Sequence, residues 1–188
     1  MKSIAIICEG KTDMEFIRGV VKHLDFKQEQ VDFYVMGSKS RFFDKTDKKY
    51  RELKLRVEAD QIVKVLFMID ADNAEKDQVY GGFENTQREL MLIIKQLGFA
   101  EISQVFITCD PTTKTGYLES LILSTLCEKQ RACIQRFLDC SEFKSKEDHK
   151  AIINQVYKTA YPEAPYNFEH QHFNELKQQL TELFQDVA

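Results

Sequence analysis

The sequence predicts an α/β fold in which helices cover both faces of a central parallel sheet of about four strands. Short apolar runs without polar alternation recur along the first two thirds of the chain, as in strands that are buried on both faces. Segments with apolar residues at helical spacing separate these runs. We therefore expect a three-layer core over residues 1–125, with residues 126–188 as a helical extension packed on it.

Four segments carry the strand pattern. The first, residues 3–8, reads SIAIIC and ends at Glu9, and the third, residues 63–69, reads VKVLFMI and ends at Asp70. Both are continuous apolar runs, which is typical of central strands. The other two strands are expected at residues 31–36 and 102–108.

Three helices are expected between the strands. The first begins at Thr12, because Thr12 and Glu15 form the S/T-x-x-E pattern of a capping box. The second, over residues 47–60, is highly charged and has a thin apolar stripe. The third, over residues 84–97, is amphipathic and is followed by Gly98, the C′ glycine that ends many helices.

Helical patterns alone occupy the remainder of the chain. Breaks are expected near Ser141, Pro162 and Pro165, and no strand signal returns. We interpret the tail as packed on the core and not as an independent domain. Its four helical segments are residues 117–127, 129–138, 146–161 and 168–184.

Composition excludes several classes of protein. A net charge of -4 argues against a protein coated in positive charge, such as a histone-like binder. The five cysteines are odd in number and form no C-x-x-C pair, so we expect reduced, mostly buried thiols in place of a disulfide framework or zinc knuckle. The apolar stretch at the N-terminus is too short for a signal peptide or a membrane span, which predicts a cytoplasmic protein without a membrane partner.

Acidic residues follow the strands. The first strand delivers Glu9, the third delivers Asp70 and Asp72, and the fourth delivers Asp110, while Glu119 lies early in the next helix. Ligands of open parallel sheets bind beyond the carboxyl ends of the strands. Clustered carboxylates repel one another unless a cation neutralises them. Mg²⁺ or Mn²⁺, which take carboxylates, water and phosphate oxygens, is the expected cofactor.

Each acidic motif also has a simpler interpretation. Asp70-Ala71-Asp72-Asn73 is a typical turn sequence, and an acid such as Glu9 is favoured before a helix N-terminus by the macrodipole. Neither interpretation explains why two strongly apolar strands both end in acids. The combination therefore favours a metal site.

The same residues carry a family resemblance. A hydrophobic strand ending in Glu9-Gly10, followed about sixty residues later by one ending in Asp70-Ala71-Asp72, resembles the Toprim domain. That domain is shared by topoisomerases, bacterial primases, recombination proteins and overcoming-lysogenization-defect (OLD) nucleases. The resemblance covers about residues 3–125. It implies a Rossmann-like core whose acids bind Mg²⁺ for phosphodiester chemistry.

The resemblance also implies roles for individual residues. By position, Glu9 is similar to the Toprim glutamate, a general acid/base or metal ligand, and Asp70 and Asp72 to its metal-binding pair. Asp13 resembles an extra acid of the nuclease branch. Glu119 resembles the acid of a Leu-Glu motif in that branch and in small stand-alone Toprim proteins. Nothing in the chain resembles a topoisomerase cleavage domain, a primase zinc module or an ATPase domain.

Such acids would hold one or two ions that activate water and stabilise the leaving oxygen. Lys11, at the start of the first helix, would add positive charge to backbone N–H groups that favour a phosphate, or it is an ordinary exposed lysine. Lys114, beside Asp110, has the same two interpretations. The expected catalytic residues are Glu9, Asp70, Asp72 and Lys11, and the expected metal ligands are Glu9, Asp70, Asp72, Asp13 and Glu119.

A basic segment provides a candidate track for nucleic acid. Residues 39–56 contain eight lysine and arginine residues against three acidic residues, with Phe42, Phe43 and Tyr50 among them. This composition suits phosphate contacts and base stacking, although a solvated helix with its polar loop at residues 37–46 is the alternative. The residues expected to contact nucleic acid are Lys39, Arg41, Lys45, Lys48, Lys49, Arg51 and Lys114.

The sequence thus favours a stand-alone, Mg²⁺-dependent Toprim-type nuclease acting on DNA or RNA, with a protein as a further candidate partner. The alternative is a non-catalytic Toprim module that binds nucleic acid or a protein in recombination, repair or phage defence. A receiver domain or a haloacid-dehalogenase phosphatase would carry its acidic pair after the first strand. No G-x-S-x-G, Walker A or G-x-G-x-x-G motif is present. The nucleic-acid type and the oligomeric state stay open.

Overall fold

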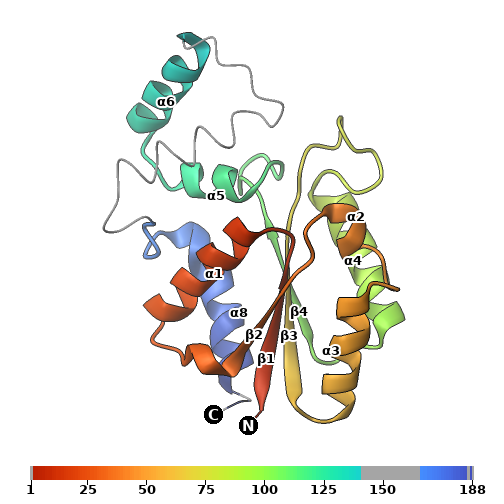
Figure 1. Cartoon of the computed structure of the whole chain (residues 1–188). Helices are drawn as coiled ribbons and strands as arrows, with labels where there is room; N and C mark the ends of the chain where they lie inside the picture. The colour runs from red at the N-terminus through yellow and green to blue at the C-terminus, as the bar shows by residue number, and fades with distance from the viewer. Residues whose placement is uncertain (1, 141–165, 186, 188) are drawn as a thin grey trace.

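The computed structural model describes residues 2–140, 166–185 and 187. Its centre is a four-stranded, all-parallel sheet in the order β2-β1-β3-β4, with helices on both faces (Figure 1). The predicted fold class, a three-layer α/β core with C-terminal helices, is confirmed. The strands are β1 (Ser3–Cys8), β2 (Val31–Val35), β3 (Ile62–Asp70) and β4 (Ser103–Thr108).

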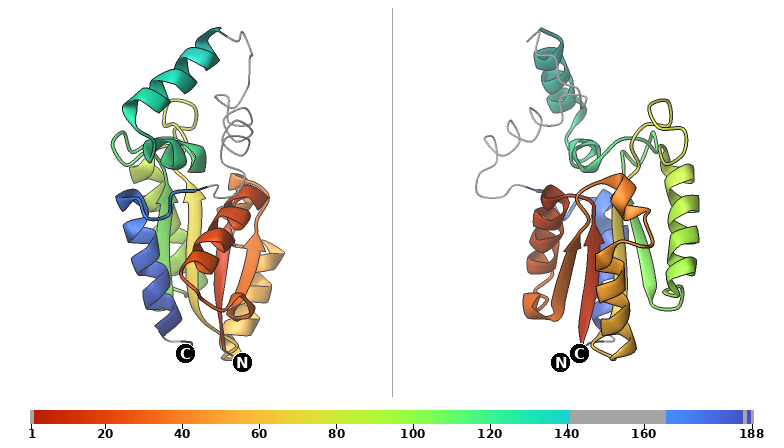
Figure 2. Two further views of the ribbon diagram at one scale, coloured as in Figure 1. Left: turned by 90° about the vertical axis from the view of Figure 1, so that its left-hand side faces the viewer. Right: turned by 45° about the vertical axis from the view of Figure 1, so that its right-hand side comes forward.

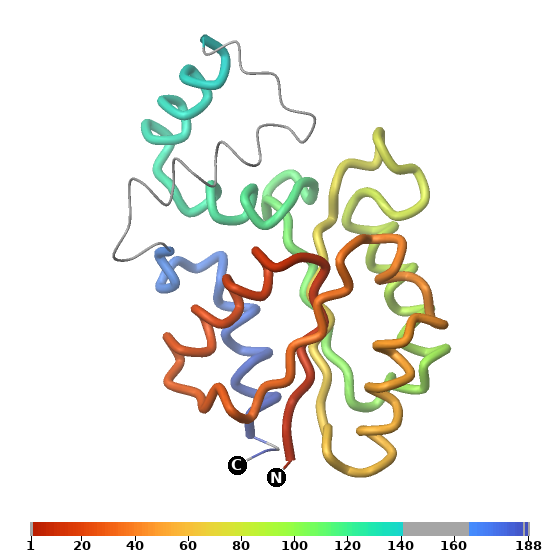
Figure 3. Tube along the Cα trace, in the orientation of Figure 1, coloured from red at the N-terminus to blue at the C-terminus, as the bar shows by residue number. Residues whose placement is uncertain are grey.

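The two central strands are the two most apolar segments of the sequence. Every residue of β1 is buried, and β3 is buried from Val65 to its end. Because side chains alternate along a strand, Ile4 and Ile6 face one hydrophobic cluster while Ala5 and Ile7 face another. β1 and β3 run side by side through the middle of the molecule (Figure 3).

The helices form a layer on each face of the sheet. α1 (Lys11–His23), α5 (Leu118–Ser124) and α8 (Asn174–Gln185) cover one face, and α2 (Lys39–Phe42), α3 (Lys48–Glu58) and α4 (Phe83–Leu97) cover the other (Figure 2). The other helices in the described part of the chain are η1 (Gln28–Gln30), α6 (Glu128–Cys140) and η2 (Gln171–Phe173).

Two local predictions in the first half of the chain were wrong. Helix α1 starts at Lys11, not at Thr12. Its N-cap is Gly10, because the Asp13 carboxylate accepts a hydrogen bond from the Gly10 N–H at 2.7 Å. The segment predicted as a polar loop contains α2, whose first turn is capped by the Ser38 hydroxyl.

The tail also differs from its prediction in part. α5 ends at Ser124 and α8 begins only at Asn174, after the turn η2, so both helices are shorter than expected. α8 belongs to the same cluster as β1 and α1, which places a C-terminal helix in the core layer. The helix predicted over residues 146–161 lies outside the described residues.

The cysteines are free, as expected, but the prediction that most are buried was wrong. Only Cys8 and Cys109 are buried, because both lie in or beside strands. The other three are Cys127, Cys133 and Cys140, on or next to α6, which extends beyond the sheet (Figure 1). Among the described helices, none is both long enough and apolar enough to cross a membrane.

A polar cluster at the amino end of the sheet gives a testable pH dependence. Partial burial of Asp32 raises the pKa of its carboxyl, but hydrogen bonds from Arg56 (2.7 Å) and Ser3 (2.6 Å) outweigh this effect and hold the pKa below the ordinary 3.8. Because the pKa is lowered in the folded state, the stabilisation is present at neutral pH and is lost as the pH falls through the folded-state pKa.

We therefore expect Asp32→Asn to lower the free energy of unfolding by at most about 1 kcal/mol at pH 7, since the pair is partly exposed. The difference from the wild type should shrink as the pH falls below 3.8. Urea unfolding between pH 3 and pH 7 measures this, and a difference that does not vary with pH would contradict it.

Candidate functional site

The acids that follow β1 and β3 lie at the point where the chain leaves the sheet toward opposite faces. After β1 it passes to α1 on one face, and after β3 it passes to α4 on the other. The two strands are neighbours, with Cys8 paired to Met68, so Glu9 follows one strand end and Asp70 closes the adjacent one. In open α/β sheets such a switch point is where ligands bind. The structure thus brings together the two strand ends that the sequence singled out.

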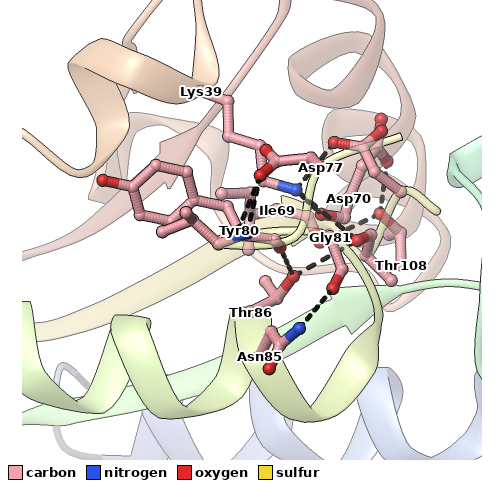
Figure 4. Close-up of polar contacts among 12 residues, drawn as sticks. Lys39, Ile69, Asp70, Asp77, Tyr80, Gly81, Asn85, Thr86 and Thr108 are labelled. Carbon is pink, nitrogen blue, oxygen red and sulfur yellow. Dashed lines mark hydrogen bonds and ion pairs between the residues drawn. The ribbon is translucent and has the colours of Figure 1, made fainter. Parts of the chain in front are cut away.

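Asp70 is the most firmly held acid of this edge. It is buried and pairs with Thr108 in the register of β3 and β4. Its Oδ1 accepts a hydrogen bond from the Thr108 hydroxyl at 2.5 Å (Figure 4). The same oxygen accepts the Leu118 N–H, at the start of α5, at 2.9 Å. Asp70 therefore fixes the ends of β3 and β4 and the entry of α5. Thr108 was not predicted as a site residue, although its position at the end of the next parallel strand is a usable signal.

Asp72 lies in an unusual backbone conformation. Its φ is 58°, and a two-way backbone pairing with Gly116 holds it there, with N–H···O distances of 2.8 and 3.0 Å. Gly116 has a φ of 97°, and a Cβ at this position would lie 2.3 Å from the Ser120 hydroxyl oxygen, so only glycine fits. A left-handed conformation costs a non-glycine residue about 1 kcal/mol and is often found at functional sites.

Lys39 lies among the acids and not on an external track. Its Nζ donates to Asp72 Oδ2 at 2.7 Å and contacts the backbone oxygens of Asp70 and Ala71 at 3.3 and 3.5 Å (Figure 4). The Lys39 side chain is only 12% exposed. The structure therefore makes Lys39 the internal counter-ion of Asp72, a role that the sequence analysis did not foresee.

The other predicted acids follow the ends of β1 and β4. Glu9 is half-buried, its backbone oxygen accepts the Gly37 N–H at 2.7 Å, and its carboxylate Oε2 is shielded from solvent. Asp13 is buried and caps α1. Glu119 is buried in the first turn of α5, one residue after the N–H that Asp70 binds. Asp110 stands apart, because its carboxylate accepts the Thr112 N–H at 2.7 Å and thereby stabilises the turn after β4.

These acids do not close around one point in the present arrangement. Among the described residues, no three His, Cys, Asp or Glu side chains group closely enough to hold a metal ion. The side chains of these acids nevertheless offer only hard oxygen ligands. The Lys39 ammonium already lies against one of these carboxylate oxygens, that of Asp72, and against the backbone oxygens of Asp70 and Ala71. The residues fit a hard divalent cation by their chemistry, provided that Asp72 turns away from Lys39.

Only part of the predicted basic track is exposed to solvent. Arg41 pairs with Asp47 at 2.7 Å, and Lys49 donates to the backbone oxygen of Val35, so both have structural partners. Lys39 and Lys49 are half-buried, whereas the other residues of the predicted track are exposed; they are Arg41, Lys45, Lys48, Arg51 and Lys114. Lys11, outside this track, is exposed as well. Lys114 lies 5.0 Å from the centre of the Phe83 ring.

The aromatic residues of this segment do not offer stacking surfaces. Phe42 and Tyr50 are buried in the core, so the prediction that they suit base stacking was wrong. Both rings pack against Phe67 of β3, which makes them packing residues. Phe43 stacks on Tyr80 with ring centres 4.4 Å apart, tying the segment to the loop after β3.

Cys8 is not a candidate nucleophile. Burial, with a further contribution from the nearby Asp13 charge, raises the pKa of its thiol to about 12. The reactive form of cysteine is the thiolate, which is therefore almost absent at neutral pH. The chemistry of this edge thus rests on oxygen ligands and lysines.

No protein-family model, curated protein or solved structure matches this chain. A functional conclusion has to come from the residues at the carboxyl edge and from their contacts.

Proposed function

We propose that this protein is a Toprim-type enzyme that hydrolyses phosphodiester bonds of nucleic acid with Mg²⁺ or Mn²⁺ as cofactor. One observation carries the proposal: Glu9 and the pair Asp70 and Asp72 follow neighbouring parallel strands at the switch point of the sheet. This is the placement that the Glu-Gly and Asp-x-Asp motifs require if their acids are to share a ligand.

The contacts of each acid suggest a role for it in this reaction. Asp70 and Asp72 would hold the cation, which when bound supplies Lewis-acid stabilisation of the phosphate and a more acidic water. The Asp70 carboxylate is held in place, because the Thr108 hydroxyl and the Leu118 N–H both donate to it. Glu9 follows the neighbouring strand β1, so its carboxylate would share the same cation.

The exposed lysines suit the binding of a polyanion. Lys45, Lys48 and Arg51 lie on the segment that leads into α3 and on its first turn. Lys11 is exposed at the start of α1, directly after Glu9-Gly10. Phosphate contacts of this kind supply affinity without reading sequence and weaken as salt concentration rises. Nucleic acid is therefore the proposed partner.

A second candidate is the non-catalytic module that binds nucleic acid or a protein. The observation that favours it is the pairing of Asp72 with Lys39, which neutralises a proposed ligand with the chain's own charge. In a module without turnover, this pair would be a permanent structural contact.

Turnover distinguishes the two candidates. The purified full chain should cut labelled single- or double-stranded DNA or RNA with Mg²⁺ or Mn²⁺, and chelation or Glu9→Gln should stop cleavage. Glu15→Gln is the matched control, because Glu15 is an exposed acid of α1 and should leave cleavage unchanged. If the protein binds nucleic acid but cleaves none of these substrates with either metal, the proposed enzymatic function is wrong and the non-catalytic binding module is favoured.

A further inference from the structure

The contact between Lys39 and Asp72 has the composition of an occupied cation site. An ammonium group carries three donors, and the structure gives Lys39 three oxygens: one from the Asp72 carboxylate and one each from the backbone of Asp70 and Ala71. The Lys39 side chain is 12% exposed, and that of Asp72 is 29% exposed. The positive charge is therefore held at the end of β3, largely shielded from water.

The place of Lys39 in the fold explains why its charge is held at the end of β3. Lys39 is the first residue of α2, which follows β2 at the same edge of the sheet (Figure 1). The backbone of Asp72 is fixed by its pairing with Gly116, so only side chains can rearrange here. The carboxylate of Asp72 can thus turn toward Lys39 or toward a ligand at the switch point.

Those two arrangements oppose each other. A divalent ion bound by the Asp72 carboxylate at roughly 2.0 to 2.6 Å, even through its second oxygen, would lie within a few ångströms of the Lys39 ammonium that donates to Oδ2 at 2.7 Å. Repulsion between such charges is strong where water is largely excluded.

We propose that Lys39 is a built-in competitor of the divalent cation: its ammonium neutralises Asp72 in the metal-free protein and leaves when the ion binds. This inference rests on the proposed metal site and adds its regulation. It follows that the protein is stable without metal, and that its affinity for the ion is lowered by the cost of displacing Lys39.

Substitution of Lys39 tests the competition through metal affinity, measured by electron paramagnetic resonance of Mn²⁺ with the full chain. Lys39→Met keeps the length of the side chain and removes the charge, so we expect Mn²⁺ to bind about tenfold more tightly. In EDTA the same variant should unfold at a lower temperature than the wild type, because Asp72 has lost its counter-ion. Lys45→Met removes an exposed charge of the same segment and should change neither property.

The outcomes separate this inference from the proposed function. If the wild type binds Mn²⁺ and Lys39→Met binds it no more tightly than Lys45→Met does, the competition is wrong and the metal site stands. If neither the wild type nor any variant binds Mn²⁺, the metal site and the proposed function both fail. Should Lys39→Met not fold, Lys39→Gln replaces it, since its amide still donates to Asp72 without a charge.

Discussion

Asp70→Asn is expected to reduce Mg²⁺-dependent cleavage by at least about a hundredfold while the protein stays folded. Asparagine has the same shape, and its amide oxygen can still accept the hydrogen bonds from the Thr108 hydroxyl and the Leu118 N–H. What it lacks is the negative charge that a divalent cation requires. The substitution thus separates the chemical role of Asp70 from its structural role.

Asp70→Ala provides the comparison. It removes the acceptor altogether and leaves the Leu118 N–H buried without its partner, which costs about 1 to 3 kcal/mol of unfolding free energy. Cleavage rates and urea unfolding of the two variants, measured beside the exposed-acid control Glu15→Gln, distinguish the effects. Cleavage by Asp70→Asn at the wild-type rate would show that Asp70 does not ligate the catalytic metal ion.

Leu180→Ala is expected to lower the free energy of unfolding by about 2 to 5 kcal/mol. Leu180 is completely buried in α8, where it belongs to the cluster formed with β1, β3 and α1. Removal of its side chain leaves a cavity against the sheet. The effect should therefore be as large as that of a substitution in the N-terminal part of the core.

Gln178→Ala is the matched control on the same helix, because Gln178 is exposed. It should change the unfolding free energy by less than about 0.5 kcal/mol. Urea unfolding followed by circular dichroism measures both variants. If Leu180→Ala costs no more than Gln178→Ala, α8 does not belong to the core.

The fold was predictable because its signals are local and redundant. The continuous apolar runs of β1 and β3 and the helical spacing in α1 and α4 each indicate an element without knowledge of the others. The details that the sequence did not predict depend on single contacts or on very short elements. β3 extends to Asp70 because Asp70 pairs with Thr108, and α2 has only four residues, too few for a periodic pattern.

The site was predictable in position but not in its contacts. That Glu9 and Asp70 stand at strand ends could be inferred from the end of each apolar run, whereas the adjacency of β1 and β3 is known only from the order of the sheet. The pairing of Lys39 with Asp72 joins residues 33 positions apart, and that of Thr108 with Asp70 joins residues 38 positions apart. No local pattern encodes such contacts, so Lys39 could not be told from its exposed neighbours. Burial, which only the structure gives, makes the difference.

The central claim is that Glu9, Asp70 and Asp72 bind one divalent cation at the switch point of the sheet. A crystal soaked in Mn²⁺ tests it most directly, through the anomalous scattering of the metal. We expect a peak within roughly 2.0 to 2.6 Å of carboxylate oxygens from both strand ends, with Lys39 displaced from Asp72. Crystals in which Lys39 keeps its contact with Asp72 and no peak lies between the three acids would contradict the claim.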